Sequence, residues 1–416
     1  MGNDRGPGPA GGTPALGIVG AGQLARMMVE AASELGVRTV VLAARADDAA
    51  VPVASEVVLG EATCGRALAD LVARCDIVTF DHEQVDLEQL HQLEREGARL
   101  RPGLQTLRVA VDKAEMRARL AAEGLPVPRY EVLDGDARGP EQLAAAVCTF
   151  AGLEGWPVVV KAARGGYDGK GVWSVDGEAA ARALCEEAAS ARIPLLVEAH
   201  VDIDVELAVV VARGEDGTSV AWPPVETAQV GGVCREVRYP GRLDPDLAGR
   251  AAALAREVAE VVGATGVLAV ELFSSDGRLC VNEIAARPHN SAHWTIEGST
   301  TSQFENHVRA VLGLPLGDTS PLAAHVASVN VFGALSGEAV SGEAVSGEEE
   351  LGDHLSAALS VRGAHVHLYG KTPRPGRKLG HVTVCGDDPT DVRTRAWAAA
   401  RALGTPVPDS VDVAAS

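Results

Sequence analysis

The sequence predicts an α/β fold in its first third and an α+β fold with much antiparallel sheet in the remainder. Apolar strand patterns and helical patterns alternate near the N-terminus, at 15–20, 23–35, 37–43, 65–74, 76–80 and 86–96. Such alternation is typical of an open parallel sheet. After about residue 129, short turns separate the strand patterns, at 157–163, 172–175, 195–201, 206–213, 266–273 and 278–285. Helical patterns are few there, at 178–190, 247–262 and 302–312, so antiparallel pairing is expected.

Three further segments divide the chain. Residues 1–14 are rich in Gly and Pro and lack an apolar core segment, which indicates a loose tail and not a signal peptide. Pro126 and Pro128 mark a boundary after a helix that contains Lys113. Residues 334–348 repeat a five-residue unit ending in Ser-Gly-Glu three times, too few copies for a solenoid. We expect an acidic, solvated loop there, followed by a strand-rich segment at 362–385.

Composition excludes several classes of protein. The 416 residues carry 37 Lys+Arg against 57 Asp+Glu, a net charge of −20, which argues against a nucleic-acid backbone as the main partner. No stretch reaches the roughly 18 uncharged apolar residues of a membrane span. The seven cysteines form no CxxC pair, which favours free thiols in a reducing cytoplasm and provides no zinc framework.

Lysine is rare in this chain and clusters in three windows. Five of the 37 basic residues are lysines, which leaves 32 arginines, and the lysines are Lys113, Lys161, Lys170, Lys371 and Lys378. An ammonium group is a compact point charge that suits phosphate, whereas a guanidinium is a planar fork. The alternative is chance survival in an Arg-biased composition.

Two Gly-rich segments could bind phosphate. Residues 20–25 fit G-x-G-x-x-G/A, but the second strand lacks the ribose-binding acid, so a dinucleotide site is not expected. A simpler phosphate site and a plain structural turn both remain open there. Residues 164–171 hold four glycines between two strands, and Lys161 and Lys170 bracket this hairpin. No Ser or Thr follows Lys170, so this segment is not a Walker A loop. A hairpin that binds a nucleotide triphosphate explains the segment better than a merely flexible hairpin does.

A candidate metal site lies on the strand pair around Ser275-Asp276-Gly277. With a three-residue loop, residue 269 faces residue 283, and Glu271 and Glu283 share one side of the sheet. A two-residue loop would place them on opposite sides. Two carboxylates with the amide oxygen of Asn282 suit Mg²⁺, although a solvated acidic sheet face is an equal alternative.

Two later segments could bind anions. Residues 287–294 include Arg287, His289, Asn290 and His293, which suit a carboxylate or bicarbonate. The two histidines are four residues apart, but Pro and Asn-Ser disfavour a helix and no third ligand is evident, so zinc is not expected. Residues 369–378 carry four cations, Lys371, Arg374, Arg377 and Lys378, and His381 just beyond is counted as the fifth. Such a patch is typical of a phosphate site or of a solvated turn that balances nearby acids.

Together these segments resemble the ATP-grasp superfamily, and within it the 5-(carboxyamino)imidazole ribonucleotide synthases of purine biosynthesis. The resemblance extends from about 15 to 385 and is carried by residues 22–28, 79–83, 166–171, 282–285, 287–294, 301–305 and 369–378. It implies an ATP-grasp fold with a Rossmann-like domain at 15–110, a lid region at 111–195 and a central domain at 196–320. A C-terminal β-rich domain at 321–400, with the acidic loop over 334–350, and a tail at 401–416 would follow.

The resemblance also implies roles for single residues. The nucleotide contacts would be Lys113, Lys161, Gly166, Gly169, Lys170, Gly171, Glu198, Val201, Glu206, Gln229 and Asn282. The Mg²⁺ ligands would be Glu271 and Glu283. The pocket for bicarbonate and the substrate amine would be formed by Tyr167, Asp168, Lys170, Arg287, His289 and Asn290. The ribonucleotide would contact Gln23, Glu83, Lys371, Arg377 and Lys378.

The implied reaction is ATP- and bicarbonate-dependent carboxylation of 5-aminoimidazole ribonucleotide through carboxyphosphate, in a cytoplasmic homodimer. The sequence departs from the family pattern at Ala286 and Ala292, where Pro and Gly are expected, and at Gln84 and Gln229, where His is usual. These departures leave open an ATP-grasp ligase for another phosphorylated amine. A dinucleotide-dependent oxidoreductase and a non-catalytic nucleotide sensor are the alternatives from other classes.

Overall fold

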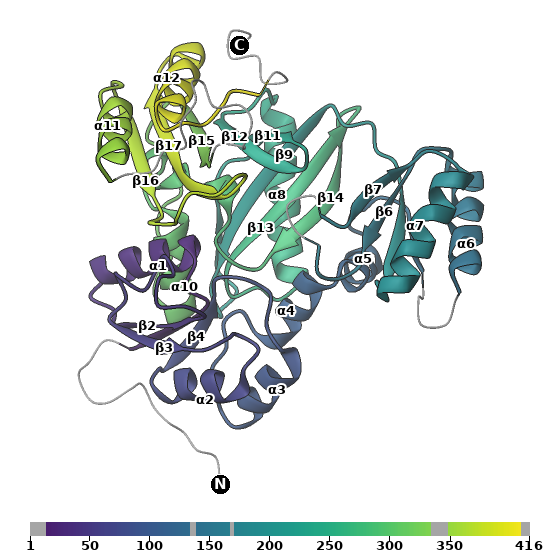
Figure 1. Ribbon diagram of the computed structural model, residues 1–416, viewed down its shortest axis with the longest axis horizontal. Coiled ribbons are helices and arrows are strands. Elements are labelled where there is room, and N and C mark those ends of the chain that lie inside the picture. Colours follow the sequence, from purple (N-terminus) through teal and green to yellow (C-terminus); the bar gives the residue numbers. More distant parts are fainter. Residues whose placement is uncertain (1–13, 134–138, 167–169, 334–347, 409–416) are drawn as a thin grey trace.

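The computed structural model describes residues 14–133, 139–166, 170–333 and 348–408. Within these residues the strands form three sheets, of four, nine and four strands. Figure 1 shows the N-terminal sheet below the large central sheet, the small sheet to one side, and the C-terminal helices above. The expected tail lies, for residues 1–13, outside the described residues. The same holds for residues 334–347 of the expected acidic loop and for residues 409–416.

The N-terminal sheet confirms the predicted parallel α/β start. Its order is β3-β2-β1-β4, and each neighbouring pair is parallel. The strands are β1 Leu16–Val19, β2 Thr39–Ala43, β3 Glu56–Leu59 and β4 Ile77–Phe80. The helices are α1 Gln23–Glu34, α2 Gly65–Ala73, α3 Leu87–Arg95 and α4 Leu104–Val111. Strand β1 is buried throughout because helices cover both sheet faces, which explains its continuous apolar run. Strand β3 was not predicted.

The small sheet is antiparallel in the order β5-β8-β6-β7. Its strands are β5 Tyr130–Leu133, β6 Val158–Ala162, β7 Val172–Val175 and β8 Leu195–Ala199. Helices α6 Pro140–Glu154 and α7 Glu178–Ala191 pack on one face of this sheet. Helix α5 Lys113–Ala122 precedes it. The division expected at 195/196 falls inside β8.

The central sheet has the order β14-β13-β9-β11-β12-β15-β17-β16, with β10 beside β9. Its strands are β9 Val205–Arg213, β10 Ser219–Ala221, β11 Val225–Val230, β12 Val233–Tyr239, β13 Gly266–Ser275, β14 Arg278–Ala285, β15 His325–Phe332, β16 Ala364–Leu368 and β17 Lys378–Gly386. Strands β10, β11, β12 and β15 were not predicted. Because β12 pairs with β15, the C-terminal strands extend the central sheet and do not form a separate one.

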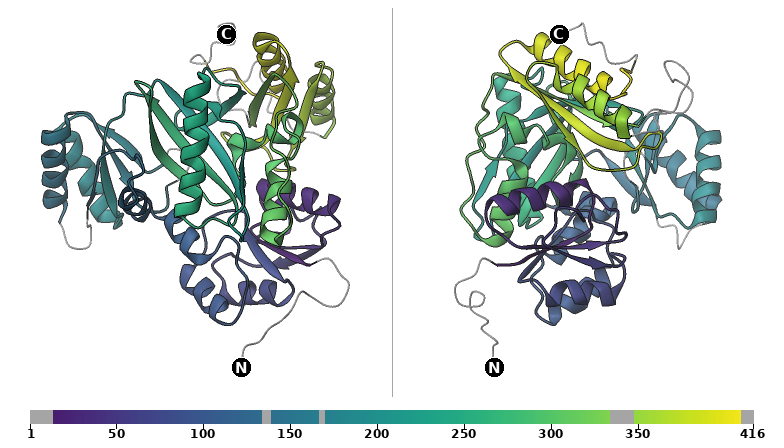
Figure 2. Two further views of the ribbon diagram at one scale, coloured as in Figure 1. Left: turned by 180° about the vertical axis from the view of Figure 1, so that it is seen from behind. Right: turned by 60° about the vertical axis from the view of Figure 1, so that its left-hand side comes forward.

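Different helices pack on different parts of the central sheet. Helix α8 Pro245–Val261 packs on β9 and β13, and short turns η1 Asn290–Ala292 and α9 Thr295–Gly298 follow β14. Helix α10 Gln303–Leu312 packs against the N-terminal sheet as well, as Figure 2 shows from behind. Helix α11 Glu348–Leu359 begins in the last residues of the expected acidic loop, at 348–350, and continues beyond it. Helix α12 Pro389–Ala402 packs over β15 and β17. No helix in the described ranges is long and apolar enough to cross a bilayer.

Candidate functional site

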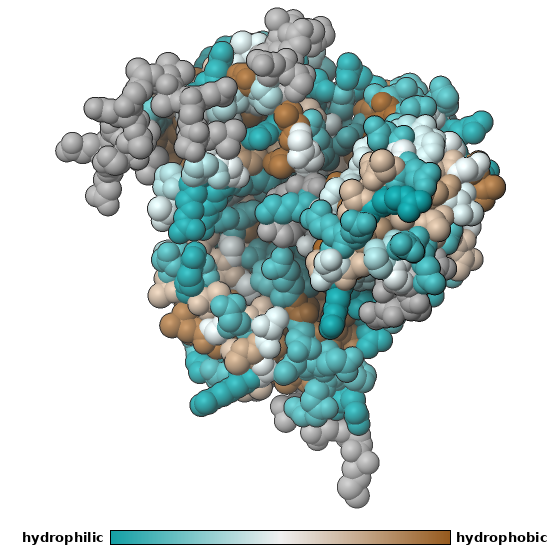
Figure 3. All heavy atoms as spheres, turned by 45° about the vertical axis from the view of Figure 1, so that its right-hand side comes forward, coloured by the Kyte–Doolittle hydropathy of each residue, from teal (hydrophilic) through white to brown (hydrophobic). Residues whose placement is uncertain are grey.

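A pocket of about 570 Å³ lies between the small sheet and the central sheet. Figure 3 shows this face of the molecule, where hydrophilic residues surround a hollow. The predicted site residues among its lining are Glu83, Lys113, Lys161, Gly166, Glu198, Val201, Glu206, Gln229, Glu271, Asn282, Glu283, Arg287, His289, Asn290 and Lys378. Residues that are far apart in the sequence therefore converge on one pocket.

Strands β13 and β14 bring the two predicted metal ligands together, but not by the expected turn. The loop has two residues, Asp276 and Gly277, because Ser275 pairs with Arg278. The expected three-residue loop is therefore wrong. The register shifts by one residue between Glu271 and Leu272, which leaves Asn282 bulged and pairs Glu271 directly with Glu283. The bulge restores the same-side arrangement that the two-residue turn alone would have lost.

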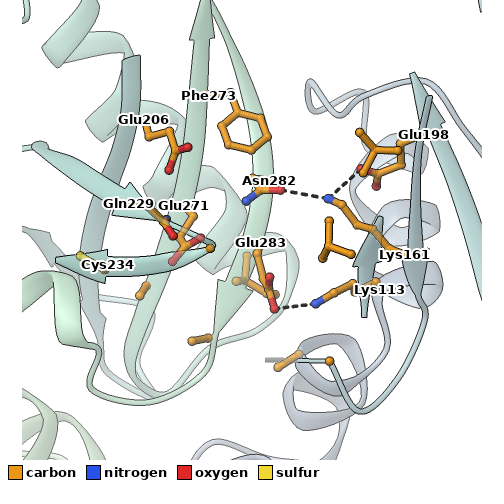
Figure 4. A pocket seen from close by; sticks show the side chains of 18 of the residues that line it. Lys113, Lys161, Glu198, Glu206, Gln229, Cys234, Glu271, Phe273, Asn282 and Glu283 are labelled. Atoms are coloured by element: carbon orange, nitrogen blue, oxygen red, sulfur yellow. Dashed lines mark hydrogen bonds and ion pairs between the residues drawn. The ribbon is translucent and has the colours of Figure 1, made fainter. Parts of the chain in front are cut away.

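Two lysines cross the pocket toward these ligands, as Figure 4 shows. Lys113 Nζ donates to Glu283 Oε1 (2.6 Å), and Lys161 Nζ donates to Asn282 Oδ1 (3.0 Å). Both lysines are buried, and Lys161 is also paired with Glu198 Oε2 (2.7 Å). Burial lowers the pKa of Lys161, and the carboxylate of Glu198 opposes this shift. The lysines thus extend from the small-sheet side to the residues that would hold a metal.

Glu198 is a buried residue of the pocket lining and faces two cations. Its carboxylate accepts hydrogen bonds from Arg117 Nε (2.6 Å) and pairs with Lys161, on opposite oxygens. Burial alone would raise the pKa of Glu198, but the charges of Arg117 and Lys161 leave it below its ordinary value. An adenine contact at this position would therefore use main-chain atoms, because the side chain is already occupied.

The carboxylates of the pocket fit a divalent cation. Burial, together with the charges of Glu283 and Glu206, raises the pKa of Glu271 to about 7. Burial also raises the pKa of Glu206, against a hydrogen bond from Gln229. The described residues contain no group of three or more His, Cys, Asp or Glu side chains able to hold a metal. Two carboxylates and one amide oxygen would leave the remaining positions to phosphate and water oxygens, as Mg²⁺ prefers.

The segment after β14 places a guanidinium and an imidazole at the pocket. Arg287 Nε donates to Glu83 Oε2 (2.9 Å), which joins this segment to the N-terminal domain. His289 Nδ1 accepts a hydrogen bond from Ser291 N (3.3 Å), so the ring proton lies on Nε2, 3.7 Å from Glu271 Oε1. Burial and the positive charges of Arg287 and Lys378 lower the pKa of His289 to about 3. The imidazole is neutral at pH 7, and with Nδ1 engaged by Ser291 it can donate a hydrogen bond from Nε2.

A second cluster lies where α1 meets the segment between β16 and β17. Lys371 Nζ donates to Gln23 Oε1, whereas Arg377 Nη1 donates to Thr372 O (3.1 Å). Burial lowers the pKa of Lys371 to about 8. The amides of Gly22 and Ala25 at the start of α1 both donate to the carboxylate of Asp81. Of the two readings of the first Gly-rich segment, this favours the structural turn.

Comparison with known proteins identifies the family. Three family models match in succession: a ribonucleotide synthetase preATP-grasp domain at 14–111, an ATP-grasp domain at 118–304 and a phosphoribosylaminoimidazole carboxylase C-terminal domain at 327–395. The N5-carboxyaminoimidazole ribonucleotide synthase of Mycobacterium tuberculosis H37Rv is 45% identical over 392 residues, covering 94% of this chain and 88% of that protein. The chain belongs to the N5-carboxyaminoimidazole ribonucleotide synthase family.

Other members of this family are similar along the whole chain. The synthase of Corynebacterium ammoniagenes is 41% identical, covering 94% of this chain and 92% of that protein. A solved N5-carboxyaminoimidazole synthase of Aspergillus clavatus, in complex with ADP and 5-aminoimidazole ribonucleotide, has a TM-score of 0.82 at 28% identity. It covers 94% of this chain, and this chain covers 99% of it. The predicted ATP-grasp fold is therefore confirmed.

Some of the predicted site residues do not line the pocket, and others are not among the residues that the structure describes. Tyr167, Asp168 and Gly169 lie outside the described residues. Lys170, Gly171, Gln23, Lys371 and Arg377 do not line the pocket, although Gly171 O accepts a hydrogen bond from Ala162 N (2.7 Å). Of the four departures from the family pattern, Gln84 and Gln229 line the pocket, and Ala286 and Ala292 are buried.

Two residues that support the site were not predicted. Arg117 follows Lys113 by one helical turn on α5, and the i,i+4 spacing was the available signal. Gln303 is fully buried at the start of α10. Its amide accepts from His289 N (2.8 Å) and donates to His289 O (2.7 Å), so it fixes the backbone of the pocket histidine. No local pattern distinguishes Gln303 from a surface glutamine.

Proposed function

We propose that the chain carries out the ATP-dependent carboxylation of 5-aminoimidazole ribonucleotide to N5-carboxyaminoimidazole ribonucleotide, in purine biosynthesis. The names of its family relatives state the product, N5-carboxyaminoimidazole ribonucleotide, and one relative was solved with ADP and 5-aminoimidazole ribonucleotide. One observation in this chain supports it most strongly. Lys113 and Lys161 face the Glu271–Glu283 pair across a pocket that continues to Arg287 and His289. A triphosphate and a small anion would both find countercharges there.

The nucleotide would lie between the small sheet and the central sheet. Lys113 and Lys161 would bind its phosphates, and Glu206 and Gln229 its ribose side. The hairpin at 166–171 would cover the phosphates, with Gly166, Gly169, Lys170 and Gly171. Glu271, Glu283 and the amide of Asn282 would hold Mg²⁺, which when bound neutralises charge on the phosphates. The lysines already paired with these acids would exchange part of that contact for phosphate oxygens.

Bicarbonate would be held next to the terminal phosphate by Arg287, Asn290 and His289, with Tyr167 and Asp168. Arg287 supplies a fixed cation, and the Nε2–H of neutral His289 would donate a hydrogen bond to a bicarbonate oxygen. Attack of bicarbonate on the γ-phosphate breaks the bond to ADP and forms carboxyphosphate. The exocyclic amine then attacks the carboxyl carbon, or carbon dioxide released from it, and phosphate leaves and takes up the proton that the amine gives up. Exclusion of water protects the intermediate from hydrolysis.

The ribonucleotide phosphate would bind Gln23, Lys371, Arg377 and Lys378, and Glu83 would orient the acceptor through Arg287. This division keeps the acceptor site at the N-terminal and C-terminal domains and the nucleotide site between the two ATP-grasp sheets. We propose the domain limits given above on the same basis, apart from the division at 195/196, which falls inside β8. A homodimer and a cytoplasmic location remain predictions.

The deciding experiment measures ADP formation from ATP and Mg²⁺ at controlled bicarbonate, with and without 5-aminoimidazole ribonucleotide. Turnover that requires both the ribonucleotide and bicarbonate is expected. Turnover that is indifferent to the ribonucleotide would preserve the ATP-grasp activity but reject this acceptor. Other phosphorylated amines would then be tested in the same assay.

A further inference from the structure

Arg117 is a buried side chain that connects the small sheet and the central sheet, between which the nucleotide pocket lies. The side chain is 0% exposed and comes from α5, one turn after Lys113. Its Nε donates to Glu198 Oε1 on β8 (2.6 Å). Its Nη2 donates to the main-chain carbonyl of Asn282 on β14 (2.7 Å). A single guanidinium therefore joins a helix, the small sheet and the central sheet.

The contact of Arg117 with Asn282 involves the residue that determines how Glu271 and Glu283, the two proposed metal ligands, face each other. Asn282 is the bulged residue whose extra position turns Glu283 to face Glu271. A bulge leaves the extra residue outside the regular strand ladder, so its carbonyl needs another partner. Arg117 supplies that partner. The guanidinium thereby stabilises the local backbone geometry on which the facing carboxylates depend.

The second contact of Arg117 is with Glu198, which is also the ion-pair partner of Lys161, the lysine proposed to bind phosphate. Glu198 uses one carboxylate oxygen for Arg117 and the other for Lys161. With Arg117 holding one oxygen, the second oxygen stays directed at Lys161 Nζ, which also reaches Asn282 Oδ1 (3.0 Å). Arg117 thus acts on the lysine and on the bulge at the same time.

A purely structural role explains this arrangement less well. Burying a guanidinium is costly, and the Nη1 group of Arg117 is buried without a hydrogen-bond partner. A well-packed apolar side chain of similar volume is often neutral or stabilising in place of a buried ion pair. The two hydrogen bonds that Arg117 makes end at the two features of the pocket that position phosphate and metal.

We propose that Arg117 is a positioning residue for metal-bound nucleotide, acting through Lys161 and through the Asn282 bulge. The inference rests on the proposed function, since it assumes that ATP and Mg²⁺ bind in this pocket. It predicts that Arg117 matters more for nucleotide with metal than for nucleotide alone. The acceptor site, at Gln23 and Lys371, should not respond to it.

The test compares Arg117→Lys with Arg119→Lys. Lysine keeps the charge and the aliphatic stem, but one ammonium cannot reproduce the two fixed directions of a guanidinium. Arg119 lies on the same helix and also donates to a main-chain carbonyl, Val261 O, but it does so at the surface. Calorimetry measures the affinity for ADP with Mg²⁺ and with chelator, and steady-state assays give the KM for each substrate.

For Arg117→Lys we expect the affinity for ADP to fall about tenfold with Mg²⁺ and less than about threefold with chelator. The KM for ATP should rise in parallel, and the KM for the ribonucleotide should stay within about twofold. Arg119→Lys should match the wild type in every measurement. Thermal unfolding defines a common temperature at which all variants are folded.

Equal losses with and without Mg²⁺, or a result equal to that of Arg119→Lys, would overturn the proposal. Arg117→Gln, which keeps one donor but no charge, provides a second variant with the same expectation. If neither variant folds, the role of Arg117 is structural and the proposal is rejected. A wild-type protein that binds no nucleotide would instead reject the proposed function itself.

Discussion

Glu271 and Glu283 face each other across β13 and β14, and Lys113 neutralises one of them. With both acids ionised, these three groups carry a net charge of −1. Under the proposed function, the acids would bind the divalent cation and the lysine would bind phosphate of the nucleotide. The charge of the pocket is therefore arranged for exchange of partners rather than for a permanent ion pair.

Glu283→Gln tests the metal assignment. The amide keeps the size of the side chain but removes one anionic ligand, so ADP formation should fall on the order of 100-fold or more. Circular dichroism and thermal unfolding should show a folded protein. Glu257→Gln, on the exposed face of α8, is the control and should retain full turnover. An active Glu283→Gln enzyme would disprove the assignment.

Lys371→Met tests the acceptor site. Burial lowers the pKa of Lys371 to about 8, so the side chain is still largely protonated at pH 7 and able to bind phosphate. Loss of this charge should raise the KM for the ribonucleotide about 10- to 100-fold and leave the KM for ATP unchanged. Arg374→Met removes an exposed charge from the same turn and should have little effect. An equal rise in both KM values would contradict separate sites.

Helix α10 and strands β4 and β13 meet at one buried histidine. His307 Nδ1 accepts a hydrogen bond from Val267 N (3.0 Å), so its ring proton lies on Nε2, which donates to Thr79 Oγ1 (2.8 Å). This neutral form joins the N-terminal sheet to the central sheet. Burial lowers the pKa of His307 to about 3.

His307→Gln tests this element by its pH dependence. The folded protein keeps His307 neutral, whereas the unfolded chain takes up a proton below its ordinary pKa of about 6.5. Its contribution to stability is thus complete above that pKa and is lost as pH falls toward 3. From pH 7 to pH 5 the wild type should lose about 2 kcal/mol more unfolding free energy than His307→Gln. Urea unfolding at both pH values measures this difference.

Exposed His91→Gln is the matched control and should follow the wild type. Equal pH dependence in the wild type and in His307→Gln would show that His307 does not carry this effect. The other buried histidines remain in all three proteins, so their contributions cancel in the comparison.

The C-terminal strands continue the central sheet, and one buried ion pair ties their covering helix to it. Arg393 on α12 donates from Nε to Glu236 Oε1 on β12 (2.7 Å) and from Nη2 to Oε2 (3.1 Å). Both side chains are buried, so this bidentate pair lies inside the contact between the two parts. We expect the C-terminal part and the central sheet to unfold together.

Arg393→Met tests this coupling. The substitution leaves Glu236 buried without that cation, so unfolding free energy should fall by about 3–5 kcal/mol. The surface pair of Arg182 and Glu178 on α7 supplies the control, and Arg182→Met should change stability by less than about 1 kcal/mol. Denaturant unfolding followed by circular dichroism measures both. Two separate transitions in the wild type would contradict a single cooperative unit.

The sequence alone was sufficient for much of the fold and for the chemical types at the site. The first parallel strands carry their own apolar and Gly signals, and the lysines stand out against an Arg-rich composition. Strands β11, β12 and β15 gave no comparable signal. Their place is set by pairing within the central sheet, which depends on partners distant in the chain.

The turn between β13 and β14 shows where local reasoning ended. An expected three-residue loop assigned Glu271 and Glu283 to one face, but the turn has two residues, and only the bulge at Asn282 restores that face. Arg117 and Gln303 were missed for the same reason, because their partners come from other elements. Local sequence determined which groups are available. Tertiary packing decided which of them meet, because register, burial and hydrogen-bond partners are set by contacts between distant segments.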